Sequence, residues 1–131
     1  MQLPGIIVPE LPRGVRASWY GLPLQYATNE LDGLPVERFH EALQAEGCRE
    51  VDRPGSTCPL NLLPLFQQPE ALFPGYAEKL NNTPGGFPNA EAIHQNTLKL
   101  PVWHREEDRP LVDSYIDAFR KVTENYRDLL G

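Results

Sequence analysis

The sequence has few residues of the kinds that reactive or cross-linked sites need. Its 131 residues include two cysteines, one methionine and three lysines. Residues 1–10 lack the basic start of a secretory leader and contain two prolines, so we expect a cytoplasmic protein whose cysteines are reduced thiols. Acidic residues outnumber basic ones by 18 to 12, for a formal charge of −6. Without a positive surplus, the chain is not expected to bind nucleic acid.

Long hydrophobic runs are also absent. No stretch reaches the roughly 18–20 apolar residues that cross a bilayer, so no membrane span is expected. A chain of 131 residues is large enough for one core, which predicts a single domain over residues 1–131. Its 14 prolines are about twice the usual share and predict short elements joined by structured loops. Residues 1–14 contain three of them and are predicted to form an extended lead-in.

The strongest periodic pattern lies in the last third of the chain. Pro110 suits the first turn of a helix, and Asp108 precedes it as a candidate N-cap. Apolar residues then recur at steps of three and four, which predicts a long helix with one buried stripe. The stripe consists of Val112, Tyr115, Ile116, Phe119, Val122, Tyr126 and Leu129.

Shorter elements precede that helix. Alternating apolar residues from Tyr20 to Tyr26 predict a strand, which Pro23 restricts to an edge or to one-sided pairing. The other expected elements are a helix from Pro35 to Gly47, a short strand over Cys48–Asp52, a helix over Asn89–Asn96 and a strand over Thr97–Trp103. Between them, residues 67–88 form a long loop, whose aromatic side chains are expected to dock on the core or on a partner surface.

No catalytic, metal-binding or cofactor-binding residue can be assigned from these patterns. The three histidines lack the spacing of metal ligands, and no Ser/His/Asp set or carboxylate pair is apparent. Strand alternation directs Lys99 away from the face of Leu98 and Leu100. Gly55, Ser56 and Thr57 allow two interpretations: an anion-binding loop, or a turn that leads into an apolar stretch.

The order of these pieces resembles the C-terminal small domain of the DegT/DnrJ/StrS-type aminotransferases, which are fold-type I enzymes dependent on pyridoxal phosphate. The resemblance covers residues 15–130, and its most specific parts are ERFHEALQAEG, PLNLLPLF and LPVWHREED. It implies an α+β fold: a small antiparallel sheet with helices packed on one face and a long C-terminal helix. It also implies a sugar or cyclitol aminotransferase, or a related dehydrase.

In that family the large domain carries the cofactor lysine and the phosphate-binding residues, and this chain lacks it. The resemblance therefore implies that the chain binds no cofactor alone, and that its partner is the missing large domain or a second copy of the chain in a homodimer. It also implies substrate contacts from Arg53, Ser56, Thr57 and Asn61. Two alternatives remain open: a non-catalytic module for protein interaction or self-association, and a binder of small anionic ligands.

Overall fold

The computed structural model describes residues 3–55, 57–75 and 82–131. The chain divides into two compact units. The first unit comprises Met1–Arg53 and Asn96–Gly131, and the second comprises Pro54–Gln95. The expectation of a single domain over residues 1–131 stays a prediction.

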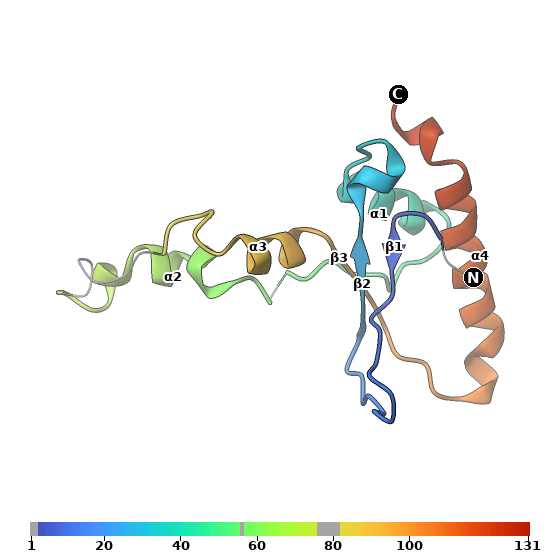
Figure 1. Cartoon of the computed structure of the whole chain (residues 1–131), viewed down its shortest axis with the longest axis horizontal. Coiled ribbons are helices and arrows are strands. Elements are labelled where there is room, and N and C mark those ends of the chain that lie inside the picture. The colour runs from blue at the N-terminus through green and yellow to red at the C-terminus, as the bar shows by residue number, and fades with distance from the viewer. Residues whose placement is uncertain (1–2, 56, 76–81) are drawn as a thin grey trace. The chain divides into compact units, whose positions relative to one another are not determined.

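A three-stranded antiparallel sheet organises the first unit, in the order β1-β2-β3 (Figure 1). Its strands are β1 (Ile6–Ile7), β2 (Leu22–Tyr26) and β3 (Thr97–Leu100). The strand containing Pro23 is therefore central, but β1 pairs only with Gln25 and Tyr26. Pro23 is paired on one side alone, with Lys99 of β3. On its other side β1 does not reach Pro23, so the missing N–H removes no hydrogen bond between β1 and β2.

The predicted strand over Cys48–Asp52 is reduced to one antiparallel bridge between Asp52 and Lys99. Two backbone hydrogen bonds form it, from the Asp52 N–H to the Lys99 carbonyl (2.9 Å) and from the Lys99 N–H to the Asp52 carbonyl (2.8 Å). Cys48 and Val51 are instead buried in the core. The bridge pairs the segment around Asp52 with the edge of β3 that does not face β2.

Two helices supply most of the remaining core. They are α1 (Val36–Ala45) and α4 (Arg109–Glu124), accompanied by the 3₁₀ turns η1 (Thr28–Leu31), η5 (Glu106–Asp108) and η6 (Tyr126–Leu129). Leu24 and Leu98 are paired across β2 and β3 and belong to the same cluster as Phe39 and Phe119 of the helices. The expected α+β fold, with an antiparallel sheet and a long C-terminal helix, is thus confirmed.

The long helix follows its predicted pattern in part, because α4 ends at Glu124 and the last two stripe residues, Tyr126 and Leu129, lie in η6. Tyr115, Phe119 and Val122 are buried, but Ile116 is 45% exposed. Pro110 lies in the first turn, as expected. Asp108 makes no cap to the helix; its carboxylate accepts a hydrogen bond from the Arg105 N–H at 3.3 Å.

The second unit consists of short helical pieces. They are η2 (Leu60–Leu62), α2 (Pro64–Gln67), η3 (Pro69–Ala71) and α3 (Pro88–Gln95). Within its described part, no large hydrophobic side chain is buried; the buried hydrophobic residues all belong to the first unit. Over the residues that the structure describes, no helix is both long enough and apolar enough to cross a membrane.

Replacing Phe39 by alanine should lower the free energy of unfolding by about 3–5 kcal/mol, because the fully buried ring would leave a cavity between sheet and helices. Urea unfolding followed by far-UV circular dichroism measures the loss. Tyr20→Ala removes another aromatic ring, one that is 98% exposed, and should cost less than about 0.5 kcal/mol. Equal losses in the two variants would contradict this core.

Candidate functional sites: two polar clusters

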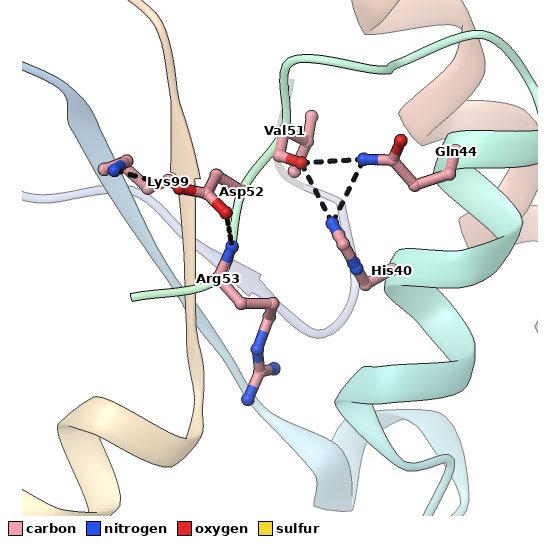
Figure 2. A network of polar contacts seen from close by, with 6 residues as sticks. All are labelled: His40, Gln44, Val51, Asp52, Arg53 and Lys99. Atoms are coloured by element: carbon pink, nitrogen blue, oxygen red, sulfur yellow. Dashed lines mark hydrogen bonds and ion pairs between the residues drawn. The ribbon is translucent and has the colours of Figure 1, made fainter. Parts of the chain in front are cut away.

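The first cluster lies where α1 faces the edge of β3 (Figure 2). Gln44 Nε2 donates to the Val51 carbonyl at 2.7 Å, and His40 Nε2 lies 2.9 Å from the same oxygen. His40 and Gln44 are one helical turn apart, so both side chains point to the same side of α1. They satisfy a carbonyl that is not used in the sheet. His40 thus has a structural contact with the segment that follows α1.

Asp52 and Lys99 form the charged part of this cluster. Lys99 Nζ lies 3.1 Å from Asp52 Oδ2 (Figure 2). The hydrogen bond from Lys99 is the main cause that lowers the pKa of Asp52, with a further contribution from the Arg53 N–H. Lys99 points away from Leu98, as strand alternation predicts, and its side chain is 39% exposed.

Arg53 follows directly and was predicted to contact substrate. Its guanidinium Nη2 lies 3.3 Å from Glu37 Oε1 on α1, and about three quarters of its side chain is shielded from solvent. Arg53 and Lys99 therefore place two cationic side chains near one sheet edge, each beside a carboxylate. An anionic group that binds to either cation would compete with the carboxylate beside it, Glu37 or Asp52.

Each lysine of the described ranges lies beside a carboxylate. Lys99 Nζ lies 3.1 Å from Asp52 Oδ2, and Lys121 Nζ lies 2.7 Å from Glu46 Oε2 on the surface. Lys79 lies outside the described residues. Within those residues no group of three or more His, Cys, Asp or Glu side chains is placed to hold a metal ion.

The other three predicted substrate residues fall in or beside the second unit's loop. Thr57 is exposed, and Ser56 lies outside the described residues. Asn61 is buried, and its amide donates to Glu91 Oε1 at 2.7 Å. The structure thus places Arg53 in one unit and Thr57 and Asn61 in the other. Their role in substrate binding stays a prediction.

Glu91 is the centre of the second cluster. In addition to the hydrogen bond from the Asn61 amide, its carboxylate accepts hydrogen bonds from the Gly85 N–H (2.8 Å) and the Phe87 N–H (3.2 Å). These bonds, that from Gly85 foremost, lower the pKa of Glu91, because they favour the charged carboxylate. The N-terminal end of α3 is therefore already supplied with a negative charge from within the chain.

The resemblance implied a substrate contact for Asn61, but no sequence pattern pointed to its partner Glu91. The useful signal was local: a glycine-rich turn, a proline at the start of a helix, and a glutamate within its first turn.

Comparison with known proteins gives a limited result. A scan against known protein families finds no match to this chain. The protein is similar to "Uncharacterized protein MJ1066" of Methanocaldococcus jannaschii, with 24% identity over 125 residues. The alignment covers 95% of this chain but 28% of the relative. The chain thus spans little more than a quarter of the length of the curated relative that it matches, and the similarity assigns it to no family.

Protonation of Glu91 should loosen the second unit. Since its pKa is lower in the folded state than the roughly 4.3 of an unfolded glutamate, its stabilisation is present above that value and is lost as the pH falls through the folded pKa. NMR titration should show the Gly85 and Phe87 amide signals moving together below pH 4.3. Glu91→Gln should abolish that titration, whereas Glu70→Gln, an exposed change in the same unit, should preserve it. Identical titrations in wild type and Glu91→Gln would refute this account.

Proposed function

We propose that this chain is the small domain of a pyridoxal-phosphate-dependent aminotransferase, or of a related dehydrase, acting on a sugar or cyclitol. The observation that carries the proposal is the difference between the two faces of the sheet. Leu24 and Leu98 on one face belong to the core together with residues of α1 and α4. The opposite face carries the polar residues Gln25, Thr97 and Lys99, and such a face is suited to polar contacts at a substrate cleft.

The long relative supports the same proposal. Nearly the whole chain matches a segment of a protein that is more than three times as long. A domain of this kind would leave the cofactor chemistry to a separate large domain. The contribution of this chain would be to bind substrate through Arg53, Ser56, Thr57 and Asn61.

The proposed location is the cytoplasm. Cys48 and Cys58 are both free thiols. Cys48 is buried, and burial raises its pKa to about 11, so it is an unreactive member of the core. A second candidate function, a module for self-association, is favoured by the exposed apolar side chains of the second unit.

A chimera tests the aminotransferase proposal. This chain replaces the matching segment of MJ1066, and the chimera, intact MJ1066 and this chain alone are each mixed with pyridoxal phosphate. We expect a Schiff-base absorption band from MJ1066 and the chimera, and none from the chain alone. Borohydride reduction followed by peptide mass spectrometry should locate the modified lysine outside the replaced segment. A folded MJ1066 without the band, or a specific Schiff base on Lys99 of the isolated chain, would contradict the proposal.

A further inference from the structure

An apolar groove opens on the surface of the first unit, between the segment around β1 and the helix α4 (Figure 1). Its volume is about 320 Å³, at the lower end of the range found for small-molecule sites. Three parts of the first unit line it with apolar side chains, such as Val8 near β1, Leu100 of β3 and Ile116 of α4. The groove thus belongs to one unit and has the size of a ligand site.

Two of the lining side chains are exposed although their chemistry favours burial. Val8 is 56% exposed and Ile116 is 45% exposed. Ile116 belongs to the apolar stripe of the long helix, whose pattern predicts a buried residue. An apolar group that entered the groove would remove both side chains from water, which is favourable.

The segment around β1 is held in place at Gly5. The Gly5 N–H donates to Glu30 Oε2 at 2.8 Å, and the Gly5 carbonyl accepts from the Ala27 N–H at 2.9 Å. Gly5 has a φ of +73°, and a Cβ at this position would lie 2.6 Å from Cδ1 of the fully buried Leu31. Only glycine fits there without strain. This side of the groove is therefore preformed, which lowers the cost of binding a ligand.

An aromatic pair contributes to the lining as well. The ring centroids of Trp103 and Tyr115 lie 4.8 Å apart in an edge-to-face arrangement. The Tyr115 hydroxyl accepts a hydrogen bond from the N–H of Glu50, a residue that does not line the groove. The polar end of Tyr115 is thus engaged elsewhere, and its ring adds apolar surface to the site.

Among the described residues that line the groove, Arg120 alone carries a formal charge. Its guanidinium donates to the carboxylate of Asp117, one helical turn earlier. The Arg120 side chain is 38% exposed, whereas that of Asp117 is 70% exposed. An ion pair so open to solvent contributes little stability. The carboxylate of a ligand can therefore share the guanidinium with Asp117 or replace it.

We infer that this groove binds a small amphipathic carboxylate, whose apolar body lies against Val8 and Ile116 and whose carboxylate pairs with Arg120. At roughly 30 Å³ for each water-sized group, the groove holds about ten non-hydrogen atoms, which is the size of octanoate. The inference uses residues of the first unit alone and does not rest on the aminotransferase proposal. The loop around Gly55, considered above for anions, belongs to the second unit and has no part in it.

Octanoate and 1-octanol are suitable probes because they share an apolar chain and differ in charge. The Trp19→Phe change leaves Trp103 as the remaining tryptophan, so its fluorescence reports on the groove. Octanoate, added below the concentration at which it forms micelles, should bind saturably. Arg120→Gln should weaken octanoate binding at least about fivefold and leave 1-octanol binding unchanged, because only octanoate pairs with the guanidinium.

Arg109→Gln is the matched control for the charge. Arg109 lies on the same helix and has an equivalent ion pair, with Glu106, but it does not line the groove. It should leave the affinity for octanoate unchanged. Asp117→Asn removes the competing carboxylate and should tighten the binding of octanoate without affecting 1-octanol.

A second pair of variants tests the apolar lining. Ile116→Gln should weaken the binding of both probes, because it places a polar group against their chains. Leu111→Gln changes another exposed apolar residue of α4, one that does not line the groove, and should weaken neither. Thermal unfolding verifies the fold of each variant. If Ile116→Gln lowers the melting temperature, Val8→Gln makes the same test from the opposite side of the groove.

Three results would overturn the inference. The first is octanoate that does not bind saturably, and the second is an affinity for octanoate that Arg120→Gln leaves unchanged. The third is a dimer in sedimentation velocity that Ile116→Gln dissociates, because a second copy of the chain would then cover the groove.

Discussion

Phe39 lies between the sheet and the C-terminal helix, with ring centroids 5.1 Å from Tyr26 and 6.3 Å from Phe119. These three rings connect β2, α1 and α4, which are far apart in the sequence. Because all three are buried, the position of each element is set by the shape of the other two. The polar cluster at the edge of β3 depends on this arrangement, since α1 carries His40, Gln44 and Glu37 to the segment that contains Val51 and Arg53.

The second unit is ordered by different physics. Its described residues surround the Glu91 carboxylate with hydrogen-bond donors. These hydrogen bonds orient the donor groups toward Glu91, but they bury little apolar surface. The buried hydrophobic residues of the described chain all belong to the first unit, so these hydrogen bonds take the place of an apolar core in the described part of the second unit.

The features that depend on local pattern could be predicted from the sequence. The amphipathic helix α4, the helix that starts after Pro35 and the β2 strand all have strong periodicity, and one-sided pairing near Pro23 follows from its missing N–H. The strand predicted at Cys48–Asp52 failed because its apolar residues turn into the core, leaving only Asp52 to pair with Lys99. That outcome depends on where α1 packs in the fold, and no local sequence pattern specifies this position.

The candidate sites were harder to predict for the same reason. The resemblance implied a substrate contact for Arg53, but its partner Glu37 is 16 residues away on α1. Glu91 is likewise 30 residues from Asn61. Periodicity reports which face of an element is buried, not which charges meet across elements. Each cation of the sheet-edge cluster has a nearby carboxylate, so any anionic ligand must compete with a group already in place.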